Sequence, residues 1–316
     1  MVMLCHAVAA QPVTGLQRLL DAELARFPGR AGVWVKHLTG GEEAGVRADE
    51  TFNSASVIKI PVMVLAYQLA ERSQASLDER IIVRAEDVRG GSGIFRYHDP
   101  GLQPTLRDVL MQMVITSDNT ATDLAIAKVG GVARVNGWLA ENGYADGMRL
   151  TQTTGELFAK YNALPPGADR DEKTNGDRTY WLGEMTPRAT GRMLAALHQC
   201  SGGPLGPPPP LGPPPPSSPP PPSAIASQKS CEAMLRVMRA QQAGARRLPH
   251  FLDVPVAHKT GDFPPVLAND VGVVFARSGP IVISFFTNAI DGPYGEAEDR
   301  IGRVAQMIVQ YFDGAR

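Results

Sequence analysis

The chain has 316 residues, of which 43% are hydrophobic and 20% charged, the composition of a globular protein with a large core in one domain or two closely packed lobes. The formal net charge of −1 gives no sign of a nucleic-acid partner or of binding to an anionic membrane surface. No apolar run is long enough to span a bilayer, and three widely spaced cysteines indicate neither a metal site nor a disulfide framework.

Neither the N-terminal residues nor the cysteines determine the cellular compartment of the protein. Met1–Gln11 is apolar and finishes in small residues, as a signal peptide does, but it is short and lacks a basic region. We therefore separate an N-terminal segment, 1–12, from one main domain, 13–316. Cys200 and Cys231 could pair if the chain is exported, but we expect two separate thiols.

The first part of the main domain predicts one helix and two strands. Apolar residues from Val13 to Phe27 recur at helical spacing. Ala31–Leu38 alternates as a strand does, Thr39–Gly41 is a turn, and Glu43–Ala48 is a second strand.

The next stretch, Ser56-Val57-Ile58-Lys59, reads S-x-x-K and opens an apolar run that continues to Leu69. A serine hydroxyl needs a neighbouring base to act as a nucleophile near neutral pH. On a helix, Lys59 lies one turn from Ser56, and a lysine becomes a base when burial or a nearby cation lowers its pKa. Pro61 is tolerated only in the first turn, so the helix should begin close to Ser56.

Residues 57–200 read mostly as helices. Three are indicated by apolar spacing, at 106–115, 120–129 and 132–142, and Gly143 closes the third. Ser117-Asp118-Asn119 follows the first of them. Tyr97 lies in a loop, where we expect a packing or surface role.

The last third begins with a proline-rich tract at 202–222, which no helix or strand tolerates. It is either a ligand for proline-binding domains or a tolerated surface loop, and we favour the loop. Beyond it we predict two helices and three strands, in the order 230–240, 254–259, 270–276, 281–288 and 297–312, the first and last of these being the helices. Lys259-Thr260-Gly261 begins at the last residue of the first strand.

The strings S-x-x-K, S-D-N and K-T-G in this order are the signature of class A β-lactamases and penicillin-binding proteins. From about Leu16 to Phe312 the chain resembles this serine β-lactamase superfamily, and class A in particular. The resemblance implies an α/β (α+β) fold of the β-lactamase/transpeptidase type, with a five-stranded antiparallel sheet flanked by helices and an all-helical lobe. The sheet lobe would comprise about 13–55 and 225–316, and the helical lobe about 56–200.

The resemblance also implies acyl transfer. Ser56 would attack a lactam carbonyl, and backbone N–H groups of Ser56 and Asp262 would hold the oxyanion. Ser117 would relay a proton to the leaving nitrogen, Lys259 would hold that hydroxyl in position, and Lys59 would be the base beside Ser56. A carboxylate at Asp262 is unfavourable there unless it is paired.

Substrate contacts follow from the same resemblance. Asn119 would bind the substrate's side-chain amide and Lys59, while Lys259 and Thr260 would bind its carboxylate. A side chain at Gly261 would push substrate off the strand edge.

A further arginine often helps to bind that carboxylate in the family. Arg246 or Arg247 could serve, with Arg247 preferred, or both could be solvated. We expect His258 to pack within its strand rather than act as a base.

The chain departs from the family at the loop that supplies the deacylating glutamate of class A enzymes. An ungapped match places Thr154 at the glutamate and Phe158 at the neighbouring asparagine. Glu156 is the candidate base if the loop follows another path, and Glu172 and Glu184 are the other acids nearby. Without such a base, acylation proceeds while deacylation stalls.

Three functions remain open. The chain is a β-lactamase-like serine hydrolase, a D-Ala-D-Ala carboxypeptidase-like or esterase-like acyl hydrolase, or a noncatalytic penicillin-binding sensor that stays acylated. We expect a β-lactam or peptidoglycan-like acyl substrate, no cofactor or metal, no nucleic acid and no transmembrane segment. The chain should be a monomer, and the family implies a periplasmic or secreted protein.

Overall fold

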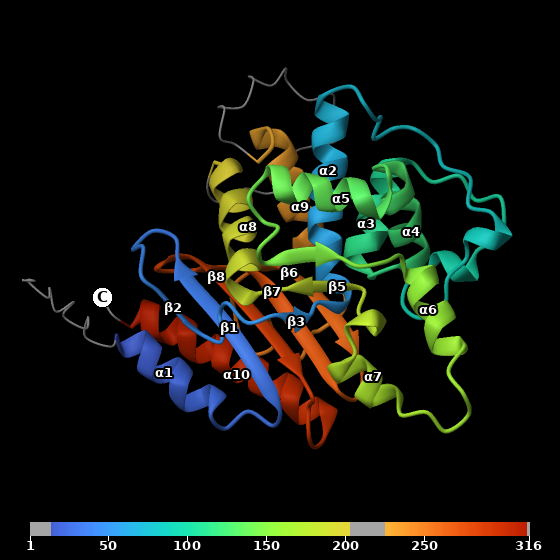
Figure 1. Ribbon diagram of the computed structural model, residues 1–316. Coiled ribbons are helices and arrows are strands. Elements are labelled where there is room, and N and C mark those ends of the chain that lie inside the picture. The colour runs from blue at the N-terminus through green and yellow to red at the C-terminus, as the bar shows by residue number, and fades with distance from the viewer. Residues whose placement is uncertain (1–13, 203–224, 315–316) are drawn as a thin grey trace, which may run out of the picture.

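An antiparallel sheet built from both ends of the main domain organises the structure, a computed structural model that describes residues 14–202 and 225–314 (Figure 1). The strands run in the order β2-β1-β8-β7-β6. They are β1 (Arg30–His37), β2 (Glu43–Val46), β6 (Val256–Phe263), β7 (Leu267–Ala276) and β8 (Gly279–Asn288). The predicted N-terminal segment and proline-rich insertion lie outside the described residues.

Alternation along the strands gives the sheet two apolar faces. On β7, Val271 and Val273 belong to one core, whereas Ala268 and Val274 belong to the other. The second of these cores lies against α1 (Gly15–Leu24) and α10 (Tyr294–Asp313), which pack against each other. Hydrophobic burial on both faces therefore fixes the register of the central strands.

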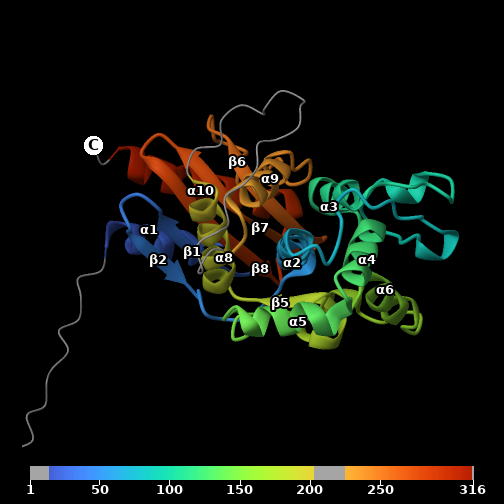
Figure 2. The same cartoon turned by 90° about the horizontal axis from the view of Figure 1, so that it is seen from above.

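The opposite face carries the remaining helices. α8 (Pro187–Cys200) packs on β1 and β8, and α9 (Gln228–Arg239) packs on β6. α2 (Lys59–Glu71) is buried from Lys59 to Leu69, as a helix apolar on every side must be. The other helices are α3 (Leu106–Ile115), α4 (Asn119–Lys128), α5 (Gly131–Glu141), α6 (Thr154–Asn162) and α7 (Arg170–Gly176). In Figure 2, α3, α4 and α6 lie to one side of the sheet.

The predicted five-stranded sheet is confirmed, but the second lobe is not all-helical. A small antiparallel sheet, β3-β5-β4, joins residues before α2 to residues near α6. Its strands are β3 (Phe52–Asn53), β4 (Met148–Leu150) and β5 (Gly183–Met185). These strands are too short to show a period in the sequence, and neither α6 nor α7 was predicted as a separate helix.

Local predictions at the boundaries were mostly correct. α3 spans the predicted residues, and Gly143 follows α5 with a φ of 75°. β6 is longer than predicted, so K-T-G lies inside the strand, where its residues pair with β7. Tyr97 is 76% exposed on a short 3-10 helix.

The prediction of two separate thiols was wrong. Cys200, at the end of α8, forms a disulfide with Cys231 in α9. The two helices pack together, which brings into contact residues 31 positions apart in the sequence. None of the described helices has the length and apolar character required to cross a membrane.

Candidate active site

A cavity of about 310 Å³ lies where the start of α2, the segment before α4, the start of α6 and the end of β6 meet. Its lining combines polar groups from two of the motifs with apolar walls. The lining residues are Ala55, Ser56, Gly91, Ser92, Thr116, Ser117, Asn119, Thr154, Leu157, Phe158, Leu182, Ala243, Asp262, Phe263 and Pro264.

Ser56 is half-buried in a 3-10 helix, Ala55–Ile58, that leads directly into α2. The residue before it, Ala55, has a φ of 42°, a strained conformation for a side chain other than glycine. Its N–H donates to Asn53 Oδ1 at 3.0 Å, and Asn269 Nδ2 donates to the carbonyls of Asn53 and Ser54 at 2.9 and 3.2 Å. These buried amides hold the strained turn that presents Ser56 to the cavity.

Gly261 on β6 is required by the same turn. A Cβ atom there would lie 2.5 Å from the carbonyl oxygen of Ser54 and 3.2 Å from the backbone nitrogen of Ser56. We expected glycine at this position because a side chain would displace the substrate. The structure gives a different reason, because the backbone of the Ser54 turn occupies the space that a side chain would need. The close approach places the strand that carries Asp262 beside Ser56.

Lys59 is fully buried one turn after Ser56. Its ammonium group donates to Ser117 O at 2.7 Å, to Asn119 Oδ1 at 3.0 Å and to Ser117 Oγ at 3.2 Å. Within the described residues it makes no hydrogen bond to Ser56. Burial, followed by the charge of Lys259, holds the pKa of Lys59 well below its ordinary value.

Lys259 reaches the same serine from the sheet. It is fully buried, and its Nζ donates to Ser117 Oγ at 3.0 Å and to the carbonyl of Thr260 at 2.9 Å. Burial lowers the pKa of Lys259 to about 8, although the carboxylates of Asp262 and Asp270 oppose this shift. Two lysines with lowered pKa values thus share one hydroxyl oxygen.

The S-D-N segment is shaped by its own backbone. Ser117 has a φ of 56°, and its carbonyl accepts from Ser92 Oγ at 2.8 Å as well as from Lys59. Asp118 caps α4 and also accepts from the N–H groups of Ile94 and Phe95, both at 2.7 Å. This carboxylate fastens the loop that forms one cavity wall.

Asn119 uses both ends of its amide. The oxygen accepts from Lys59, and Nδ2 donates to the carbonyl of Gly90 at 2.9 Å. Thr260, by contrast, is fully buried, and its hydroxyl has no hydrogen-bond partner in the described part of the chain. Lys259 and Thr260 both stand behind the cavity lining rather than in it.

Arg247 was predicted either to bind substrate or to be solvated, and the structure places it in neither setting. Its side chain is 2% exposed, and its guanidinium donates to Asp262 Oδ1, to Glu298 Oε1 at 3.0 Å and to Tyr294 Oη at 3.0 Å. Asp262 therefore has the cationic partner that a carboxylate at this position needs. Arg246 is exposed and pairs with Asp299.

His258 is buried on β6, with Nδ1 at 2.9 Å from Asp270 Oδ1 across the strand pair. Asp270 Oδ2 also accepts from the N–H of Leu248 at 3.1 Å. The histidine is engaged in the sheet interior and does not line the cavity.

The acids proposed as a deacylating base do not reach the cavity. Glu156 is exposed, and its carboxylate accepts from the N–H of Thr153 at 2.8 Å, which closes a capping box on α6. Glu172 is exposed in the first turn of α7, and Glu184 faces Arg178 at 3.5 Å. Thr154, the first residue of α6, lines the cavity, as do Leu157 and Phe158 of the same helix.

Several residues of the site were missed from the sequence. Asn269 donates a hydrogen bond to the carbonyl of Asn53, 216 positions earlier in the chain, and no local sequence pattern indicates such a contact. Asp123, whose carboxylate accepts from the Thr154 hydroxyl at 2.7 Å, lies one helical turn after Asn119, so the i,i+4 spacing could have drawn attention to it.

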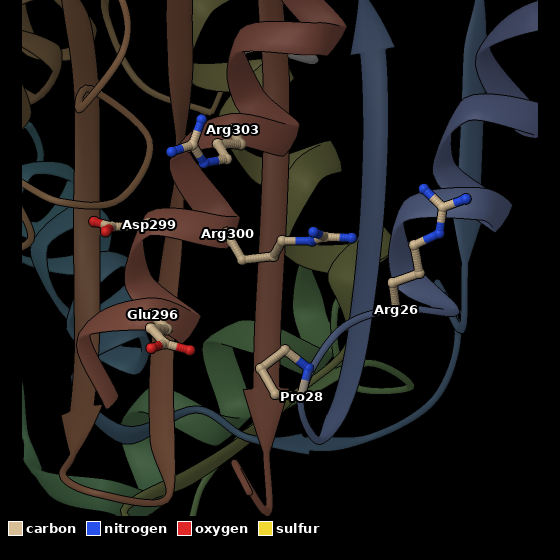
Figure 3. A pocket seen from close by; sticks show the side chains of 6 residues that line it. All are labelled: Arg26, Pro28, Glu296, Asp299, Arg300 and Arg303. Atoms are coloured by element: carbon tan, nitrogen blue, oxygen red, sulfur yellow. The ribbon is translucent and has the colours of Figure 1, made fainter. Parts of the chain in front are cut away.

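A second recess, of about 390 Å³, lies on the other side of the sheet and is lined by Arg26, Pro28, Glu296, Asp299, Arg300 and Arg303 (Figure 3). Figure 3 shows Arg300 extending from α10 toward the side where Arg26 lies. Arg26 and Arg300 both pair with Glu23, at 3.7 and 3.1 Å. With no nucleophile among its lining residues, this recess carries no catalytic assignment.

The cavity thus joins Ser56, Ser117 and Asn119, with the buried Lys59 and Lys259 behind it. The profile of the beta-lactamase enzyme family matches residues 15–203 and 223–312, and the chain belongs to this family.

Individual relatives are moderately similar. Beta-lactamase L2 of Stenotrophomonas maltophilia is 34% identical over 172 residues, which span 53% of this chain and 55% of that protein. A beta-lactamase of Mycobacterium tuberculosis is 28% identical over 95% of this chain and 88% of its own. The chain thus spans only about half of the first relative but most of the second.

Solved structures share the fold over nearly the whole chain. The beta-lactamase from Sphaerobacter thermophilus superposes with a TM-score of 0.73 at 26% identity, covering 95% of this chain and 96% of that one. PBP-A superposes with a TM-score of 0.75 at 23% identity, covering 96% and 98%. A mutant of PBP-A was solved as an acyl-enzyme complex with penicillin G.

Proposed function

We propose that the protein is a serine hydrolase of β-lactams that acts through an acyl-enzyme on Ser56. The observation that carries this proposal is the Ser117 hydroxyl held between Lys59 and Lys259 at the wall of the cavity that Ser56 also lines. Two buried lysines on one hydroxyl form a proton path that a purely structural serine does not need.

Acylation follows from this geometry. Neutral Lys59 takes the proton of Ser56 as its Oγ attacks the lactam carbonyl. The same proton passes from Lys59 to Ser117 while Ser117 gives its own proton to the lactam nitrogen, and the C–N bond breaks. The 3.2 Å contact between Lys59 and Ser117 Oγ supports this order.

The tetrahedral intermediate needs donors for its oxyanion. We assign the backbone N–H groups of Ser56 and Asp262, both of which line the cavity. Because Arg247 pairs with Asp262, the carboxylate there does not stand as an uncompensated negative charge.

A second candidate is a penicillin-binding protein that remains acylated. It is favoured by the position of Glu156, which caps its own helix in solvent. A carboxypeptidase-like or esterase-like hydrolase with a different acyl substrate is the third.

Intact-mass measurement over time with penicillin G and nitrocefin separates the three. An adduct on Ser56 that forms and then disappears, with product release, supports the β-lactamase. A persistent adduct supports the binding protein or a slow carboxypeptidase-like enzyme, and no adduct at all supports a hydrolase of another acyl substrate and contradicts the proposal.

A further inference from the structure

Thr154 lines the cavity, and its hydroxyl is hydrogen-bonded to the carboxylate of Asp123. Thr154 Oγ1 lies 2.7 Å from Asp123 Oδ1 and 3.1 Å from the carbonyl oxygen of Asn119. A hydroxyl has one hydrogen to donate and two lone pairs to accept with. With its hydrogen on the nearer, charged acceptor, the hydroxyl can accept a hydrogen bond from a water molecule in the cavity.

The other polar side chains that line the cavity are engaged differently. Ser92 donates to the carbonyl of Ser117, and Thr116 donates to the carbonyl of Gln112. Asp262 is held by Arg247 and Tyr294. Among the lining residues that the structure describes, Thr154 is the one whose hydroxyl donates to a carboxylate.

Asp123 is fixed rigidly enough to keep this contact. Its carboxylate also accepts from the N–H groups of Thr154 and Gly155, at 2.7 and 2.9 Å, and from Arg89 Nε at 2.8 Å. It thus anchors the first turn of α6 to α4. The same bonds that hold the helix fix the hydroxyl of Thr154, a residue that lines the cavity.

We propose that Thr154 and Asp123 form the relay that activates water for deacylation, in place of a glutamate; this inference rests on the proposed function. Water attacks the ester carbon of acylated Ser56 and gives a proton to Thr154 Oγ1, while Thr154 passes its own proton to Asp123 Oδ1. When the tetrahedral intermediate collapses, the bond from carbon to Ser56 Oγ breaks and the proton returns through Thr154 to Ser56. Thr154 is the residue that contacts the water, and Asp123 acts through it.

The test measures adduct formation and adduct loss separately, by rapid-quench mass spectrometry with penicillin G. Thr154→Val removes the hydroxyl while keeping the shape of the side chain. We expect it to slow adduct loss by about 10²-fold, the usual scale for losing a proton acceptor, and far more than it slows adduct formation. Thr154→Ser should restore most of the loss rate, and Asp123→Asn should slow loss as Thr154→Val does.

Thr153→Val is the matched control, because it removes the cap of α6 and leaves the Thr154 hydroxyl in place. If it slows adduct loss as strongly as Thr154→Val, α6 acts only as a scaffold and the relay is overturned. A parent whose adduct persists, or a Thr154→Val variant with parental loss, overturns it as well. If no adduct forms on Ser56, the proposed function itself fails, and the relay fails with it.

Discussion

The Nζ atoms of Lys59 and Lys259 donate to the same atom, Ser117 Oγ, at 3.2 and 3.0 Å. Both side chains are fully buried, so two full charges on one acceptor are costly. Burial lowers the pKa of both lysines, and the charge of Lys259 lowers that of Lys59 further. The arrangement favours a neutral Lys59 beside a charged Lys259, which is the state that the proposed acylation of Ser56 requires.

This arrangement predicts a loss of acylation at alkaline pH. A lysine is charged below its pKa and neutral above it, so Lys259 loses its charge as the pH rises through about 8. Without that charge, the anion developing in the transition state loses stabilisation. We expect the acylation rate constant to fall above about pH 8, as measured by adduct formation with penicillin G.

Lys259→Arg provides the control, because arginine keeps its charge throughout this range. The variant should move the alkaline decline to higher pH, even if its absolute rate is lower. Circular dichroism at each pH verifies that the fold persists. A parental rate that stays constant between about pH 7 and 10 contradicts the role of the charge.

Truncating either lysine should slow acylation. Lys59→Ala removes the base for Ser56, and Lys259→Ala removes the group that holds Ser117. Each variant should acylate more slowly by about 10²-fold or more, the usual scale for a positioned proton carrier. Near-parental adduct formation in either variant would show that the motif match is accidental.

Ser56→Ala should abolish the adduct and leave the fold intact, because one hydroxyl is lost from a half-buried cavity position. The measurement is intact mass with penicillin G, with the thermal unfolding midpoint as the control for folding. An adduct in this variant would assign the nucleophile to another residue.

The sequence was sufficient to predict the large sheet, because each of its strands has a local sequence pattern. The strands predicted at 270–276 and 281–288 lie within β7 and β8. Short strings drew attention to Ser56, Lys59 and Ser117, whose catalytic roles stay a prediction. The sequence was insufficient where partners are distant. The pairing of Asn269 with the carbonyls of Asn53 and Ser54, and the burial of Arg247 against Asp262 and Glu298, depend on how the two ends of the chain meet.

The region around α6 shows the same limit in another form. The ungapped match placed Thr154 at the position of the glutamate, but the sequence could not decide whether Glu156 turned inward. A capping box decides it, because the Thr153 N–H and the Glu156 carboxylate satisfy each other at the helix start. The contact of Thr154 with Asp123 required the packing of α6 on α4.

Glu156→Gln should therefore be silent. Glutamine also completes a capping box, and the side chain is exposed, so stability should remain within about 0.5 kcal/mol of the parent. Adduct formation and adduct loss should both keep their parental rates in the rapid-quench assay. Slower adduct loss in this variant would return Glu156 to the catalytic set.

Gly261→Ala should damage both stability and acylation. The added methyl group would lie 2.5 Å from the carbonyl oxygen of Ser54. Moving either that backbone atom or the strand would cost free energy of folding. Overpacking of this kind costs about 1–3 kcal/mol. Because the strand must shift away from Ser56, the Asp262 N–H also moves, and acylation should slow.

Gly137→Ala in α5 is the matched control, since its Cβ would meet no heavy atom within 4 Å. Alanine should stabilise that helix by about 1 kcal/mol and leave acylation unchanged. Urea unfolding and adduct formation, measured on both variants, separate the two effects. A Gly261→Ala variant with parental stability and parental acylation would mean that the strand and the Ser54 turn are not held in the close contact on which the proposed oxyanion site depends.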